Sequence, residues 1–172
     1  MAATATLISL EQYLRTSYKP DRDYVNGELE ERNVGEFVHS RIQGRLAWWF
    51  TSHEEAWAVV LVTEQRITVS VNRARVCDVC LLRADAPREP VTVTPPVLCI
   101  EILSPEDRLP RATVVLEDYR RMGVENTWLI DPLRRVAYTL GPRGLELVQG
   151  NRIEVPNSPI YLDLDEIFKV LD

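Results

Sequence analysis

Residues 96–107 read Pro96-Val-Leu-Cys-Ile-Glu101-Ile-Leu-Ser-Pro-Glu-Asp107, and the rest of the chain is arranged around this stretch. Val97 to Leu103 is an apolar run, rich in β-branched residues and bounded by prolines, which is the pattern of a strand buried on both faces. Glu101 interrupts the run. A lone buried carboxylate is costly and tends to take up a proton, so a positive charge or a cluster of donors is expected beside it. Two explanations are open: a structural salt bridge to one of the many arginines, or an acid that binds metal or takes part in catalysis.

A second strand-like run, from Arg75 to Leu82, also carries an acid, Asp78. Aspartate is disfavoured in strand interiors, so its presence needs a reason. If the two strands are neighbours, the carboxylates of Asp78 and Glu101 can point into one pocket. Two oxygen ligands of this kind suit Mg²⁺ or Mn²⁺, which keep several waters and are completed by substrate phosphate. A metal held in this way can activate water and stabilise charge on a phosphodiester.

The composition limits the number of domains, the location and the kinds of partner that the protein can have. A chain of 172 residues, 45% hydrophobic and 27% charged, suits a single globular domain spanning residues 1–172. No apolar run approaches the ~20 residues that a membrane helix needs, and the N-terminus lacks a signal-peptide pattern. A cytoplasmic location without membrane association is therefore the expectation. The formal net charge of -6 disfavours nucleic-acid binding through bulk charge but leaves room for a local basic groove.

Three cysteines, Cys77, Cys80 and Cys99, lie in the strand-like runs and are expected to be reduced core residues. Cys77 and Cys80 have the C-x-x-C spacing of metal ligands. On a regular strand, however, residues three apart face opposite ways, and no second Cys or His pair follows. The pattern therefore does not favour a zinc site.

The rest of the chain alternates helices and strands. Helices are expected at 10–14 after an N-cap at Ser9, at 35–52, at 111–122 with Gly123 as the C-cap, and after Asp163 or Asp165. Strands are expected at 58–63, 67–71, 75–82, 97–103, 127–130, 135–140, 144–148 and 160–162, with residues 152–155 continuing the 135–148 hairpin. Asn26-Gly27, between two short strand-like runs, predicts a type I′ hairpin.

The helix at 35–52 has a polar stripe formed by Glu36, His39 and Gln43. In one interpretation the stripe is simply the solvated face of an amphipathic helix. In the other, this edge of the helix borders a site and lends Glu36 or Gln43 to it.

Several motifs together resemble a known family. They are Arg75-Val-Cys-Asp78-Val-Cys, Glu101-Ile-Leu-Ser-Pro, Tyr119-Arg-Arg-Met-Gly123-Val and Trp128-Leu-Ile-Asp131-Pro132, preceded by Tyr24-Val-Asn-Gly-Glu28 and His39. This set, which spans about Ser9 to Pro132, is similar to the Uma-type family of restriction-endonuclease-like proteins in the PD-(D/E)XK nuclease superfamily. The resemblance implies an α/β fold, with a central mixed sheet flanked by helices and the two acidic strands at its centre.

The resemblance also implies roles for individual residues. Asp78 would be the superfamily's metal-binding aspartate and Glu101 its second acid. The main-chain carbonyl of Ile102 would be a further ligand, and Glu36 an accessory acid. The implied activity is hydrolysis of DNA phosphodiester bonds with Mg²⁺ or Mn²⁺, and a homodimer is left open.

The chain departs from the family pattern at the catalytic lysine. The superfamily places this lysine two residues after the second acid, where Leu103 stands. Family members often carry it four residues ahead of the tyrosine, where Val115 stands. The only lysines, Lys19 and Lys169, lie near the chain ends.

Three functions therefore remain open. The first is a metal-dependent endonuclease slowed by the missing lysine, roughly a hundred-fold or more by analogy with other lost electrostatic stabilisers. The second is a noncatalytic nuclease-fold module that binds nucleic acid or a partner protein. The third is a structural domain with two buried ion pairs. Arg108 or Arg111 could supply charge, but an arginine stays protonated and cannot act as a base.

Overall fold

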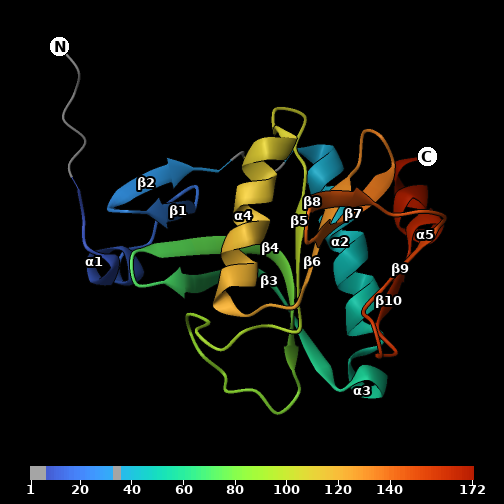
Figure 1. The fold of residues 1–172 in the computed structure, drawn as a ribbon, viewed down its shortest axis with the longest axis horizontal. Coiled ribbons are helices and arrows are strands. Elements are labelled where there is room, and N and C mark those ends of the chain that lie inside the picture. The colour runs from blue at the N-terminus through green and yellow to red at the C-terminus, as the bar shows by residue number, and fades with distance from the viewer. Residues whose placement is uncertain (1–6, 33–35) are drawn as a thin grey trace.

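The structure, a computed structural model, describes residues 7–32 and 36–172. In these residues an eight-stranded sheet has the order β2-β1-β4-β5-β6-β7-β8, and β3 pairs with β4 off this path (Figure 1). The strands are β1 Arg22–Val25, β2 Glu28–Glu31, β3 Val59–Ser70, β4 Arg73–Arg83, β5 Leu98–Ile102, β6 Asn126–Asp131, β7 Val136–Gly141 and β8 Gly144–Leu147. Only the β5–β6 pair is parallel among them, so the expected mixed α/β sheet is confirmed.

Helices cover both faces of the sheet. They are α1 Leu10–Arg15, α2 Phe37–Thr51, α3 Glu54–Trp57, α4 Leu109–Met122 and α5 Leu164–Phe168, which runs into a 3₁₀ turn at Lys169–Leu171. Helix α4 lies in front of the sheet in Figure 1 and buries Leu116 and Tyr119 against Cys99 of β5. On the opposite face, Ile42 of α2 and Ile167 of α5 join a second apolar cluster. No helix in the described ranges is both long and apolar enough to cross a lipid bilayer.

Local signals in the sequence fix the element ends. Ser9 accepts a hydrogen bond from the main-chain N–H of Gln12 at 3.1 Å and caps α1. The β1–β2 turn has positive φ at both central residues, 51° at Asn26 and 94° at Gly27, which is the type I′ geometry that Asn-Gly favours. Helix α4 ends at Gly123, whose φ of 112° is readily adopted only by glycine.

Two expectations about strands were wrong. The strands expected at 58–63 and 67–71 are one long strand, β3 (Val59–Ser70), because the chain passes through Glu64 with a φ of 51° instead of turning there. Residues 152–155 do not continue the β7–β8 hairpin. After Gly150, at a φ of 82°, β9 (Arg152–Glu154) pairs with β10 (Tyr161–Asp163) in a separate two-stranded sheet, where Ile153 and Leu162 are buried.

The cysteines are buried and free of disulfides, as expected, but their predicted orientation was wrong. Cys77, Cys80 and Cys99 all lie in the apolar cluster beneath α4. Strand β4 is irregular between Cys77 and Cys80: it pairs with β3 through Val79 and Cys77 but not through Asp78, opposite the positive-φ residue Glu64. A strict two-residue alternation therefore does not hold across Asp78.

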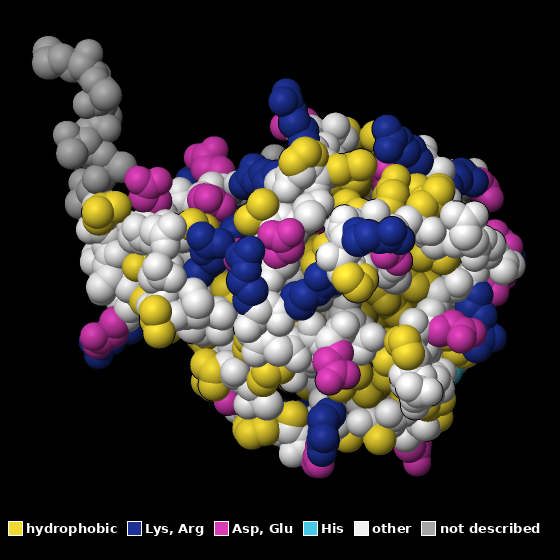
Figure 2. All heavy atoms as spheres, in the orientation of Figure 1, with side chains coloured by type: hydrophobic (Ala, Val, Ile, Leu, Met, Phe, Trp, Pro, Cys, Tyr) yellow, Lys and Arg dark blue, Asp and Glu magenta, His cyan; other side chains and the backbone are white. Residues whose placement is uncertain are grey.

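The outer face of α4 is charged. Arg111, Arg120 and Arg121 are exposed on this helix. Figure 2 shows Lys and Arg side chains gathered over this face of the molecule, with acidic side chains between them. The negative net charge thus coexists with a locally basic surface.

Candidate active site

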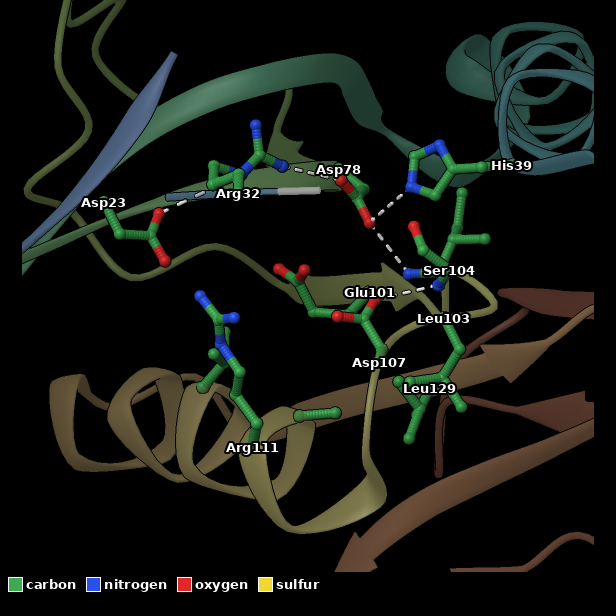
Figure 3. Close-up of a pocket in the computed structure, with 13 residues that line it drawn as sticks. Asp23, Arg32, His39, Asp78, Glu101, Leu103, Ser104, Asp107, Arg111 and Leu129 are labelled. Carbon is green, nitrogen blue, oxygen red and sulfur yellow. Dashed lines mark hydrogen bonds and ion pairs between the residues drawn. The ribbon is translucent and has the colours of Figure 1, made fainter. Parts of the chain in front are cut away.

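Asp78 and Glu101 meet where β4 and β5 separate. The antiparallel register pairs Val79 with Ile100, one step before the two acids. Both acids line the same pocket, and their carboxylates point into it in Figure 3. The expectation that the acids lie on neighbouring strands and share a pocket is confirmed.

The Asp78 carboxylate is buried and takes part in three hydrogen bonds. Its Oδ1 accepts from Nη2 of Arg32 at 2.8 Å. Its Oδ2 accepts from the main-chain N–H of Ile102 at 2.8 Å and lies 3.2 Å from Nε2 of His39. These donors replace the water that burial removes and fix the orientation of the carboxylate. Ile102 therefore contacts Asp78 through its amide, while the role of its carbonyl as a metal ligand stays a prediction.

Glu101 lies in a different environment, although it shares the pocket. Its Oε1 accepts a hydrogen bond from the Tyr119 hydroxyl at 2.6 Å. In the described part of the chain no arginine or lysine forms an ion pair with Glu101, whereas Asp78 pairs with Arg32. Loss of hydration, and then the negative charge of Asp78, raise the pKa of Glu101 well above its ordinary value. Folding therefore makes Glu101 harder to ionise than it is in the unfolded chain.

The positive charge expected near the acids comes from Arg32, which follows β2. Its Nη2 contacts Asp78, its Nη1 donates to Glu64 at 2.7 Å, and its Nε lies 4.0 Å from Asp23 (Figure 3). Burial alone would lower the pKa of Arg32, but Asp78, Glu101 and Glu64 outweigh it and raise that pKa. The sequence predicted a positive charge or a cluster of donors beside Glu101; the ion pair is made with Asp78 instead, and no motif identified Arg32 as its source.

The polar edge of α2 borders the site, in agreement with the second interpretation of the stripe. Gln43 donates from Nε2 to the main-chain oxygen of Asp78 at 3.0 Å and to Glu64 at 2.6 Å. Burial opposes protonation of His39, but the hydrogen bond to Asp78 and the charge of this residue raise the pKa of His39 above its ordinary value. His39 Nδ1 is buried and has no hydrogen-bond partner among the described residues.

The structure does not bring Glu36 to the acids. This residue is exposed at the N-cap of α2, and the pocket that Asp78 and Glu101 share is lined without it. The helix turns its next polar positions, His39 and Gln43, toward the site instead. The accessory-acid role implied by the family resemblance therefore has no geometric support.

Leu103 and Val115, the two positions at which the family resemblance implies a lysine, both line the pocket. Neither can supply a charge. Arg111 lines the pocket too, and its Nη2 donates to the main-chain oxygen of Glu31 at 2.6 Å. Arg108 is exposed at the N-cap of α4, outside the lining.

The donors suit a divalent cation in kind but not in their present arrangement. Carboxylate and carbonyl oxygens are the ligands that Mg²⁺ prefers, with water and phosphate completing the shell. Yet the described residues hold no group of three or more His, Cys, Asp or Glu side chains placed to bind an ion. Asp78 is already bonded to Arg32, His39 and the Ile102 amide. An ion bound by Asp78 and Glu101 would lie next to Arg32, which already bonds Oδ1 of Asp78.

A mixed sheet with two acids on neighbouring central strands and helices on both faces places the chain among the nuclease-fold proteins. The chain belongs to the Uma2 family, whose model, described as "Putative restriction endonuclease", matches residues 10–162. The fold is similar to the crystal structure of "a putative nuclease belonging to DUF820" from Anabaena variabilis ATCC 29413. The TM-score is 0.84 at 23% sequence identity, and the match covers 95% of this chain and 99% of the other. No curated protein matches the chain.

Proposed function

We propose that the chain is an endonuclease that hydrolyses DNA phosphodiester bonds with the help of Mg²⁺ or Mn²⁺. The observation that carries the proposal is the meeting of Asp78 and Glu101 in one pocket, from adjacent strands. Family membership supports the reaction class. Two carboxyl groups placed together in one buried pocket are costly to a fold and are typical of functional sites.

The residues of the chain have distinct roles in this proposal. Asp78, Glu101 and the carbonyl of Ile102 would hold the ion. When bound, such an ion supplies positive charge to the phosphodiester and lowers the pKa of water. The Tyr119 hydroxyl orients Glu101 through the 2.6 Å hydrogen bond, and His39 orients Asp78.

The reaction should be slow. Leu103 and Val115 are apolar where relatives have a lysine to position the attacking water and stabilise the developing charge. Removal of one such stabiliser typically reduces the rate by about a hundred-fold or more. Arg111 supports DNA as the substrate, because this exposed arginine of α4 lines the pocket and offers a phosphate contact there.

The test is nicking of supercoiled plasmid DNA by the purified protein with Mg²⁺, with Mn²⁺ and with EDTA. We expect slow, metal-dependent conversion to open circles that is abolished in Asp78→Asn and in Glu101→Gln. The matched control is Glu125→Gln, which removes one exposed carboxylate outside the pocket and should nick at the parental rate. Nicking that persists in both active-site variants would show a contaminant and sink the assignment.

A second function is favoured by one observation. The Arg32–Asp78 ion pair neutralises the acid that the reaction needs, which suits a noncatalytic module that binds nucleic acid or a partner protein. A module that binds nucleic acid would shift labelled DNA in a gel at low salt, and one that binds a partner protein would not. Neither would nick plasmid with either ion. Parent and both acid variants would then behave alike.

A further inference from the structure

We propose that Arg32 occupies the cation position of this site, so that its guanidinium and a divalent ion exclude each other at Asp78. The inference deepens the proposed function and rests on it, since it concerns the same two acids. It assigns to Arg32 the role of a built-in counter-ion that controls access of metal.

The bonding of Asp78 leaves little room for an ion. A carboxylate offers about four lone-pair sites. Two on Oδ2 face the Ile102 amide and His39, and one on Oδ1 faces Nη2 of Arg32 at 2.8 Å. The remaining site is on Oδ1, beside the guanidinium. An ion bound there would lie next to a fixed positive charge in a pocket where water screens poorly, and the two cations would repel each other.

Arg32 is held in place from several sides, unlike a loose surface arginine. Its side chain is only 19% exposed. Glu64 binds its Nη1 at 2.7 Å, and Asp23 lies 4.0 Å from its Nε. The preceding carbonyl, that of Glu31, accepts from Arg111 of α4. The hairpin and α4 thus keep the guanidinium at the mouth of the pocket.

The same contacts allow an exchange. Glu64 is 46% exposed and can keep the guanidinium after Asp78 has released it. The freed Oδ1 would then be available to a metal in the pocket that Glu101 also lines. Binding of the ion should therefore make local opening of β2 near Glu31 more frequent, because the contacts of Arg32 with Asp78 help to hold that end of the strand in the structure.

The first experiment is calorimetric titration of Mn²⁺ into parent, Arg32→Met and Arg32→Gln. We expect both variants to bind Mn²⁺ about tenfold more tightly or better, because a like charge beside the ion has gone. The Gln variant keeps a hydrogen-bond donor for Asp78 and guards against misfolding. The matched control is Arg108→Met, which removes one exposed positive charge outside the pocket lining without touching Arg32 or Asp78, and its affinity should change less than about threefold.

A second measurement uses the parent alone. At Mn²⁺ concentrations that calorimetry shows to be saturating, hydrogen exchange at the amides of β2, Glu28–Glu31, should become faster. The inference would be overturned if bound Mn²⁺ left hydrogen exchange of the β2 amides unchanged, or if the Arg32 variants bound Mn²⁺ no more tightly than the parent. The metal site itself would still stand. Absence of Mn²⁺ binding in every protein would overturn both the inference and the metal-dependent function.

Discussion

Replacing each acid of the pocket by its amide should change stability in opposite directions. Asp78→Asn removes the charge that compensates Arg32, whose side chain is largely buried. Breaking a buried ion pair costs ~3–5 kcal/mol. Because Arg32 keeps Glu64 as a partner, we expect the lower end, about 3 kcal/mol. In a chain of this size that loss lowers the Tm by roughly 6–12 °C.

Glu101→Gln should have the opposite effect. The pKa of Glu101 is raised in the folded state, so ionisation destabilises the fold, and stability falls as pH rises from the unfolded value of about 4.3 through the folded pKa. Each unit of the shift is worth about 1.4 kcal/mol. Glutamine stays neutral and still accepts from the Tyr119 hydroxyl. The variant should therefore be more stable than the parent at pH 8, with the difference vanishing toward pH 4.

The assay is thermal and urea unfolding of parent and both variants in EDTA at pH 4.5, 6 and 8. EDTA removes any contribution from bound metal, so that the comparison reports the acids and their neighbours alone. If Asp78→Asn proved as stable as the parent at pH 8, repulsion between the acids would outweigh the Arg32 pair. The reasoning from the ion pair would then be refuted.

Three further predictions concern neighbouring residues. Val115→Lys should raise Mg²⁺-dependent nicking at least several-fold, since its side chain lines the pocket, and no gain in a folded variant that binds metal would count against a lysine at this position. His39→Gln should cost more stability at pH 5.5 than at pH 8.5 in urea unfolding. Because the pKa of His39 is raised in the folded state, protonation of its side chain stabilises the fold below about pH 6.5, and this contribution disappears as pH rises through the folded pKa. Arg75→Met should cost ~3–5 kcal/mol in the same assay, because Arg75 is buried between Asp23 and Asp118; a loss below 1 kcal/mol would contradict a stabilising role.

Much of the site could be predicted from local patterns. An acid inside an apolar run is costly, so Asp78 and Glu101 stood out without any knowledge of their neighbours. Antiparallel pairing of the two runs then placed them in one pocket. The ends of α1 and α4 and the Asn26-Gly27 turn followed from residue types that favour a particular backbone conformation.

The remainder depends on long-range contacts that local patterns do not encode. Arg32 and Asp78 are 46 positions apart, and any of the many arginines could have met the acid. The φ of 51° at Glu64 interrupts the alternation of side chains between the two faces of the sheet, so Cys77 lies on a different face from the one expected. The chain also continues through Glu64, so that two expected strands form the single strand β3. Glu36 was assigned by resemblance alone, and the helix register turned His39 toward the pocket in its place.

The docking of the N-terminal hairpin also has a kinetic consequence. Strand β1 joins the sheet by pairing Tyr24 with Ala74, fifty positions away, whereas β3 and β4 are joined by a tight turn. Contacts that close long loops are entropically costly and slow to form. We therefore expect Asp78 and Glu101 to be assembled on β4 and β5 before Arg32 arrives during folding. Pulsed hydrogen exchange during refolding should protect β4 amides earlier than those of β1. Simultaneous protection of β1 and β4 would refute this order. The expected delay means that, for a short time in each folding event, the pocket of Asp78 and Glu101 exists without Arg32.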